Sequence, residues 1–231
     1  MTKDRIMSNL NTKVWSRSIV FAIVLALLLF VPAGTIEYWQ AWVYLVVFFA
    51  SSVAVTIYLM NKDPALLMRR MKAGPTAERE KTQKIIMFFA MVSFVTIFLV
   101  SALDYRFMWS PVPLAVVIGG DIVVALGFFI TFLVVKENTF ASATIEITKD
   151  QSVISTGPYA IVRHPMYSGG LLIVLGTPLA LGSLWGFLTF IPTSIWIVWR
   201  LLDEEKFLAK NLAGYDEYRA KIRYRLVPHV W

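Results

Sequence analysis

The sequence predicts an all-α integral membrane protein: a bundle of about five to six transmembrane helices that includes a short C-terminal helical hairpin. Of its 231 residues, 58% are hydrophobic and only 16% are charged, whereas a soluble domain normally carries about a quarter charged residues. Uncharged runs close to the roughly 20 residues that cross a bilayer as a helix recur along most of the chain. One compact helical domain is therefore expected.

Four runs are each long enough to cross the membrane, and they cover residues 18–36, 38–61, 85–103 and about 113–135. The first lacks a convincing signal-peptide cleavage site, so we expect it to be a retained helix. Asp121 interrupts the fourth, directly after Gly119 and Gly120. It is either a functional acid inside the membrane or a hydrogen-bonded structural residue where two helices pack closely.

The last uncharged run, residues 165–199, is too long to be one membrane helix. Its 35 residues would extend about 52 Å, against a hydrocarbon core of about 30 Å. Gly182 and Ser183 lie near its middle, between Pro178 and Pro192. We therefore predict two short helices joined by a tight turn. We also expect Gly214 to end the final helix in a left-handed cap.

The basic residues predict the orientation. All 22 Lys and Arg except Arg106 lie before residue 18 or in the segments 61–84, 136–164 and 200–231, which reach one side if the helices alternate. The positive-inside rule then places both termini in the cytoplasm, with the protein in the plasma or inner membrane. The net charge of +7 is thus interpreted as topology, and no nucleic-acid partner is expected.

The available residue types restrict the chemistry. There are no cysteines and only two histidines, so a thiolate nucleophile and a protein-held metal are not expected. No G-x-G-x-x-G segment follows a strand pattern, which argues against a soluble-type nucleotide fold. A soluble cofactor must therefore meet the polar cytoplasmic segments. In the first of these, Leu67, Met68 and Met71 predict an amphipathic surface helix that adheres to membrane lipids or gates their entry.

Two polar clusters flank the 165–199 run. The first is GPYAIVRHPMYSG, residues 157–169, and the second comprises Arg200, Glu204 and Glu205. Local physics offers simple alternatives: an interfacial belt of aromatic and basic side chains, and an ordinary salt bridge between Arg200 and Glu204 one helical turn apart. Because both clusters flank the same hairpin, we expect them to meet at one membrane face.

The order of these motifs resembles the C-terminal half of the isoprenylcysteine carboxyl methyltransferase family. GPYAIVRHPMYSG is followed by R-x-x-x-E-E-x-x-L, starting at Arg200, and then by GYDEY; upstream, the Asn138-Thr139-Phe140 and 151–154 segments fit the same pattern. The resemblance covers roughly residues 136–231, with a weaker likeness at DPALLMRRMKAGPTAEREK. We accordingly treat 1–135 as a four-helix transmembrane part and 136–231 as a catalytic, cofactor-binding part of one structural domain.

The resemblance implies methyl transfer from S-adenosylmethionine to a lipophilic, prenylcysteine-like carboxylate that enters from the bilayer. Arg200 would face the substrate carboxylate, for which a guanidinium is a natural clamp. Glu204 would hold the cofactor. The remaining cofactor contacts would come from the backbone of Gln151, Ser152, Val153 and Ile154, and from Tyr159, His164, Pro165, Met166 and Tyr167.

Three other functions stay open. The tail Tyr224-Arg225-Leu226-Val227-Pro228 is similar to that of membrane sterol reductases, which share an RHPxY-like element and use NADPH. A phospholipid N-methyltransferase would need His164, Glu204 or Glu205 as a base, because an ammonium with a pKa near 10 must first lose its proton. A non-catalytic membrane scaffold would keep the fold without binding S-adenosylhomocysteine.

Overall fold

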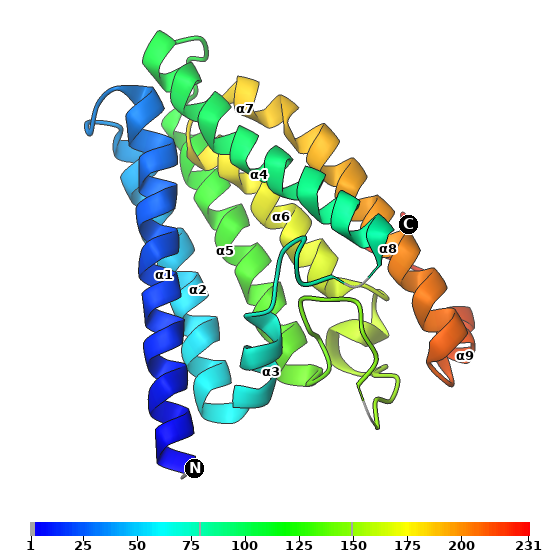
Figure 1. Cartoon of the computed structure of the whole chain (residues 1–231). Helices are drawn as coiled ribbons and strands as arrows, with labels where there is room; N and C mark the ends of the chain where they lie inside the picture. Colours follow the sequence, from blue (N-terminus) through cyan, green and yellow to red (C-terminus); the bar gives the residue numbers. More distant parts are fainter. Residues whose placement is uncertain (1–2, 79, 149) are drawn as a thin grey trace.

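The computed structural model describes residues 3–78, 80–148 and 150–231 and forms a bundle of long helices (Figure 1). The long elements are α1 (Lys3–Ala33), α2 (Trp39–Lys62), α4 (Lys81–Phe107), α5 (Leu114–Glu137) and α8 (Phe190–Asn211). The shorter ones are α3 (Pro64–Arg70), the 3-10 helix η1 (Gly157–Ala160), α6 (Pro165–Ala180), α7 (Leu184–Leu188) and α9 (Tyr215–Lys221).

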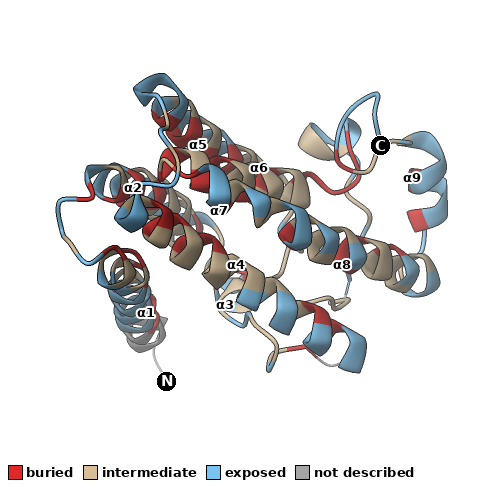
Figure 2. Ribbon diagram, turned by 90° about the horizontal axis from the view of Figure 1, so that it is seen from above, coloured by how far each residue is buried: buried red, intermediate tan, exposed pale blue. Residues whose placement is uncertain are grey.

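Five stretches within the described residues are long and apolar enough to cross a membrane: Leu10–Ala33, Trp39–Lys62, Lys81–Phe107, Leu114–Glu137 and Leu184–Asn211. Their outer surfaces are apolar; Ile19, Val46 and Ile195, for example, are each more than half exposed. Figure 2 shows this division, with buried residues facing the centre of the bundle and exposed ones facing outward. Lipid is the solvent that such apolar faces fit. The predicted all-α integral membrane bundle is confirmed.

The C-terminal hairpin turns where the sequence predicts. α6 ends at Ala180, Gly182 has a φ of 68°, and the hydroxyl of Ser183 accepts a hydrogen bond from the amide of Gly186 to begin α7. Only the first arm is short, because α8 continues past the uncharged run to Asn211. Gly214 has the expected left-handed conformation, with a φ of 81°, but it does not cap α8: the C-cap of α8 is Leu212 in an extended conformation, and Gly214 is the N-cap of α9.

Glycines bring α5 and α6 into close contact. A Cβ atom on Gly120 would lie 2.2 Å from the backbone nitrogen of Ala180, and one on Gly176 would lie 2.7 Å from the carbonyl of Gly120. The close packing predicted around Asp121 is therefore present. Asp121 itself is buried, but its Oδ1 has no hydrogen-bond partner in the described part of the chain, so the expected hydrogen bond is not found at that oxygen.

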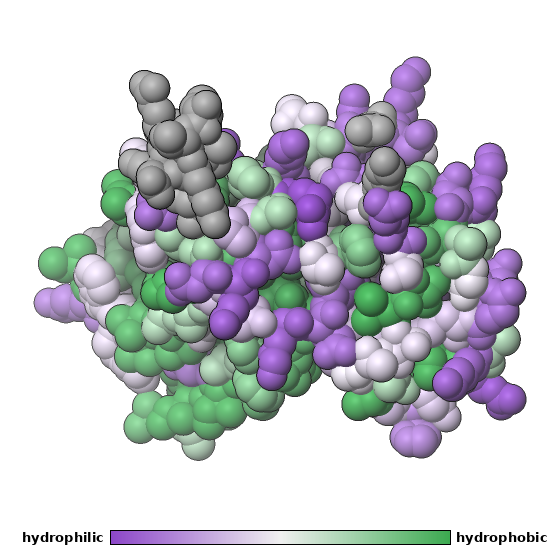
Figure 3. All heavy atoms as spheres, turned by 90° about the horizontal axis from the view of Figure 1, so that it is seen from below, coloured by the Kyte–Doolittle hydropathy of each residue, from purple (hydrophilic) through white to green (hydrophobic). Residues whose placement is uncertain are grey.

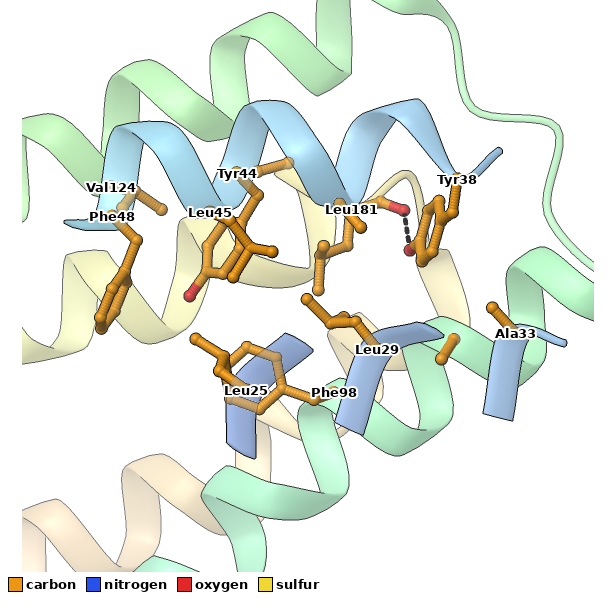
Figure 4. Close-up of a cluster of buried hydrophobic side chains, with 13 residues drawn as sticks. Leu25, Leu29, Ala33, Tyr38, Tyr44, Leu45, Phe48, Phe98, Val124 and Leu181 are labelled. Atoms are coloured by element: carbon orange, nitrogen blue, oxygen red, sulfur yellow. Dashed lines mark hydrogen bonds between the residues drawn. The ribbon is translucent and has the colours of Figure 1, made fainter. Parts of the chain in front are cut away.

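Buried polar contacts fix the hairpin turn against α2 and α4. The hydroxyl of Tyr38 donates to the carbonyl of Leu181 at 2.6 Å (Figure 4). Asp104, a second buried acid that the sequence reasoning did not single out, accepts from the hydroxyls of Ser183 at 2.5 Å and Ser110 at 2.8 Å. The turn is thus held by the N-cap residue of α2 and by α4.

The connections between the helices lie at the two ends of the bundle. The N-terminus and the long connections 71–78 and 138–164 lie at one end of the bundle, and the short connections 34–38 and 108–113 lie at the other (Figure 1). This is the grouping that alternating helices require; the side of the membrane that each end faces stays a prediction. The predicted surface helix is α3, in which Leu67 is buried and Met68 is 43% exposed.

Candidate functional site

A cavity of about 220 Å³ lies at the end of the bundle that carries the long connections. Hydrophilic side chains gather across this end of the molecule (Figure 3). Its walls come from the segment 138–154, η1, the first turn of α6, the last turns of α8, and α9. All but one of the site residues predicted from the sequence line it: Gln151, Ser152, Val153, Ile154, Tyr159, His164, Met166, Tyr167, Arg200 and Glu204.

Pro165 is the predicted residue that does not line the cavity. It is buried at the first position of α6, after His164 at the N-cap. Proline suits this position because its missing N–H has no partner in a first helical turn anyway. Its place in the motif is explained by starting the helix that carries Met166 and Tyr167.

Glu204 and Arg200 face the cavity from successive turns of α8, but they do not pair with each other. Oε2 of Glu204 accepts a hydrogen bond from the hydroxyl of Tyr167 at 2.5 Å. Nη2 of Arg200 forms its ion pair with Oε1 of Glu78 at 2.7 Å. The interpretation of an ordinary salt bridge within α8 is therefore wrong, because each side chain is held by another element.

The anchors of Arg200 come from far earlier in the chain. Besides Glu78, its Nη1 donates to Oε1 of Gln83 at 2.8 Å, and its Nη2 also donates to the carbonyl of Ala143 at 2.9 Å. Gln83, in the first turn of α4, in turn donates to Asp203. Glu78 and Gln83 are both buried, and neither was predicted. Glu78 lies in the mostly basic stretch DPALLMRRMKAGPTAEREK, whose weaker likeness to the family gave it no role.

Glu205 does not line the cavity and instead braces its wall. Its carboxylate contacts Nη2 of Arg163 at 3.0 Å, Nε2 of His164 at 3.2 Å and Nε of Arg225 at 3.0 Å. The backbone amides of Arg163 and His164 donate to the carbonyls of Tyr224 and Arg225, each at 2.9 Å. The C-terminal tail is thus bonded directly to the RHP motif.

Tyr159 connects three walls of the cavity. Its hydroxyl accepts from the side chain of Asn138 at 2.9 Å, and its carbonyl accepts from the hydroxyl of Tyr218 at 2.8 Å. Burial raises the pKa of Tyr159 to about 12. Its phenol therefore stays neutral at physiological pH and can take part in hydrogen bonds without adding negative charge.

Two buried polar atoms of cavity-lining residues have no hydrogen-bond partner among the residues the structure describes: the hydroxyl of Tyr215 and Nε of Arg163. Buried polar groups are almost always paired. Burial also lowers the pKa of Arg163, although the carboxylate of Glu205 opposes that shift. With the carboxylate of Glu204 and the neutral phenol of Tyr159, these atoms suit a ligand that carries both a cationic group and hydrogen-bond acceptors.

The cavity also has lining residues that the sequence reasoning gave no role: Ala141, Ser142, Ala143, Thr144, Ile145, Glu146 and Leu212. Others lie in stretches that it matched to the family pattern without assigning them a contact, namely Arg70, Asn138, Phe140, Arg163, Leu208, Tyr215 and Tyr218. Most of the unassigned ones lie in the irregular segment 138–154, where no periodic pattern indicates which side chains face inward.

Comparison with known proteins finds a matching family and two relatives that each match part of the chain. Residues 115–214 match the family described as phospholipid methyltransferase. Over 77 residues, 32% of this chain, the sequence is 35% identical to the Protein-S-isoprenylcysteine O-methyltransferase of Schizosaccharomyces pombe. Over 91 residues, 38% of this chain, it is 29% identical to the Delta(14)-sterol reductase TM7SF2 of Mus musculus. The matches span 32% and 22% of these two relatives.

Proposed function

We propose that the protein, whose residues 115–214 match the family described as phospholipid methyltransferase, transfers a methyl group from S-adenosylmethionine to a lipophilic carboxylate at the cytoplasmic membrane face. One observation carries the proposal: Arg200 and Glu204 from α8 line the same cavity, at one end of the membrane helices, as His164 at the N-cap of α6 and Tyr167 in its first turn. We infer a prenylcysteine-like acceptor that enters from the bilayer, in line with the name of the yeast relative.

The cavity residues fit this donor. Glu204 would hold its cationic groups, and the buried hydroxyl of Tyr215 offers a hydrogen bond that no described residue uses. The side chain of Gln151 accepts a hydrogen bond from the amide of Thr148 at 3.0 Å and is therefore engaged within its own loop. The backbone of residues 151–154, rather than the side chain of Gln151, would contact the nucleoside part of the donor. When bound, S-adenosylmethionine supplies a methyl group on a positively charged sulfur, whose transfer to a carboxylate leaves a neutral ester and a neutral sulfide.

Methyl transfer to a carboxylate then requires the protein to align donor and acceptor and does not require a base. A carboxyl group with an ordinary pKa near 4 is already ionised at pH 7. Arg200 would orient the acceptor's carboxylate, and Tyr167 would keep Glu204 directed at the donor side. Holding two reactants in line accounts for a large part of the rate in such transfers. A buried site also favours a step in which charge is neutralised.

The test of the proposal separates donor from acceptor. Calorimetry on the detergent-purified protein should show S-adenosylhomocysteine binding, dependent on His164, Tyr167 and Glu204, and no NADPH binding. Radiolabelled donor should then be offered with prenylcysteine analogues and with ethanolamine lipids. The proposal expects label that is released as methanol by base. Label that is stable to base and bound to nitrogen would refute the carboxylate and leave the donor assignment in place.

Specific observations favour two other candidates. The family description, phospholipid methyltransferase, favours an amine acceptor, for which a base must be found; His164 and Glu205 are bonded to each other at 3.2 Å, which leaves Glu204 as the freer carboxylate. The mouse sterol reductase relative favours hydride transfer. NADPH binding in place of S-adenosylhomocysteine binding would support that reductase, and binding of neither would support a scaffold.

A further inference from the structure

We infer that Glu78 is a specificity-determining residue: in the acceptor-free protein its carboxylate takes the position on Arg200 that the acid group of an acceptor needs. The inference rests on the proposed function, because it assumes an acceptor whose acid group binds Arg200. Glu78 lies in the connection between α3 and α4, outside the C-terminal motifs and outside residues 115–214, which match the family.

The hydrogens of the Arg200 guanidinium limit how many carboxylates it can bind. A carboxylate is held at two points only along an edge of the group, either by Nε and Nη2 or by Nη1 and Nη2. Each edge therefore uses a hydrogen of Nη2. In this structure both Nη2 hydrogens have acceptors, namely Oε1 of Glu78 at 2.7 Å and the carbonyl of Ala143 at 2.9 Å. Neither edge of Arg200 is free for a second carboxylate.

Of the two acceptors, Glu78 is the one that can be exchanged. The carbonyl of Ala143 belongs to the backbone of the cavity wall. The carboxylate of Glu78 is the end of a side chain; its Oε2 makes a long contact of 3.4 Å with the amide of Ile145. Gln83 holds Nη1 independently at 2.8 Å. Arg200 would thus keep its orientation while Glu78 gives way.

Charge makes this exchange selective. The side chains of Glu78 and Arg200 are 2% and 10% exposed, so an incoming acid would place a second carboxylate against Glu78 in a poorly solvated site. Like charges at such positions are costly. A small acid has only its carboxylate to offset that cost. An acid with a long apolar tail gains additional binding from the lipid-facing surface and the cavity, so Glu78 selects for lipophilic acids.

The test uses Glu78→Gln, which keeps the size and the hydrogen-bonding oxygen but removes the charge. The dissociation constants of a prenylthio carboxylic acid and of its primary amide are measured on the full-length protein loaded with S-adenosylhomocysteine. We expect Glu78→Gln to bind the acid about tenfold more tightly, which is about 1.4 kcal/mol, and to bind the amide as the wild type does. Glu80→Gln is the matched control, because Glu80 is exposed and its side chain makes no capping hydrogen bond to α4.

Unchanged or weaker binding of the acid by Glu78→Gln would overturn the inference, since a residue that only positions Arg200 predicts weaker binding. Glu78→Ala is measured in parallel and should also bind the acid more tightly; affinity for S-adenosylhomocysteine reports that each variant is folded. Methyl ester formation by the wild type judges the proposed function separately. Tighter acid binding by Glu78→Gln without any ester from the wild type supports the role of Glu78 and contradicts the proposed function. Ester formation by the wild type with unchanged acid affinity in Glu78→Gln supports the proposed function and contradicts the role of Glu78.

Discussion

Oε1 of Glu205 lies 3.0 Å from Nη2 of Arg163, and both side chains are buried. The same oxygen contacts His164, and the other contacts Arg225. One carboxylate therefore joins α8 to the segment before α6 and to the C-terminal tail. Glu204, its neighbour in the sequence, faces the cavity instead. The acidic pair divides into one residue that holds the site together and one that is available to a ligand.

Glu205→Gln should destabilise the protein by about 3 kcal/mol, because Arg163 and Arg225 would lose their shared anion. The unfolding temperature in detergent measures this. Asp216→Asn is the control: it removes a carboxylate from a pair with Arg219 whose side chains are 46% and 62% exposed, and such pairs contribute less than about 1 kcal/mol. Equal effects of the two substitutions would contradict the bracing role of Glu205.

Gly120→Ala should destabilise the packing of α5 on α6. The new methyl group would lie 2.2 Å from the backbone nitrogen of Ala180, and overpacking of this kind costs about 1 to 3 kcal/mol. Gly119→Ala has no atom within 4 Å of the added carbon and should leave the unfolding temperature unchanged or slightly raised. A comparable loss in both variants would show that helix flexibility, not close approach, explains the glycine.

Tyr167→Phe should weaken S-adenosylhomocysteine binding about tenfold, because Glu204 loses a charge-assisted hydrogen bond that fixes its carboxylate. Calorimetry measures the dissociation constant. In the control, Tyr224→Phe, the lost hydroxyl is hydrogen-bonded to His229 at an exposed site, away from the cavity lining, and binding should not change. Wild-type affinity in Tyr167→Phe would argue that Glu204 does not contact the ligand.

Single cysteines in the cysteine-free chain should test the topology. Asp150→Cys lies at the cavity end, and Met108→Cys, at a residue that is 86% exposed, lies at the opposite end. With both termini in the cytoplasm, a membrane-impermeant thiol reagent added outside should label position 108 only. Labelling of position 150 from outside, with position 108 protected, contradicts the orientation.

Much of the fold can be predicted from properties that are read directly from the sequence, such as the length of an uncharged run and the positions of glycines. The length of the 165–199 run requires a fold-back, and the turn occurs at Gly182 because a glycine tolerates its positive φ. The convergence of His164 and Tyr167 with Glu204 follows from the same hairpin, since both of its ends return to one face. These predictions depend on length, local conformation and motif order, all of which are local properties of the chain.

The partners of Arg200 could not be predicted in this way. Glu78 and Gln83 precede it by 122 and 117 residues, and no periodic pattern links such distant positions. The spacing of Arg200 and Glu204 suggested a pair within α8, but an exposed pair of that type is worth only about 0.2 to 0.5 kcal/mol. A buried acid that satisfies Arg200 and a phenol that satisfies Glu204 outweigh so small a preference. Asp104 was missed for a related reason, because its partner Ser183 lies 79 residues later, in the hairpin turn.

The hydrogen bonds from Arg163 and His164 to Tyr224 and Arg225 also set an order of assembly. During synthesis the amides at 163 and 164 emerge about sixty residues before the carbonyls that they need. Every apolar helix of the chain has by then been made and can enter the bilayer. The wall of the cavity that these hydrogen bonds close is therefore completed only when the tail reaches back to the start of α6.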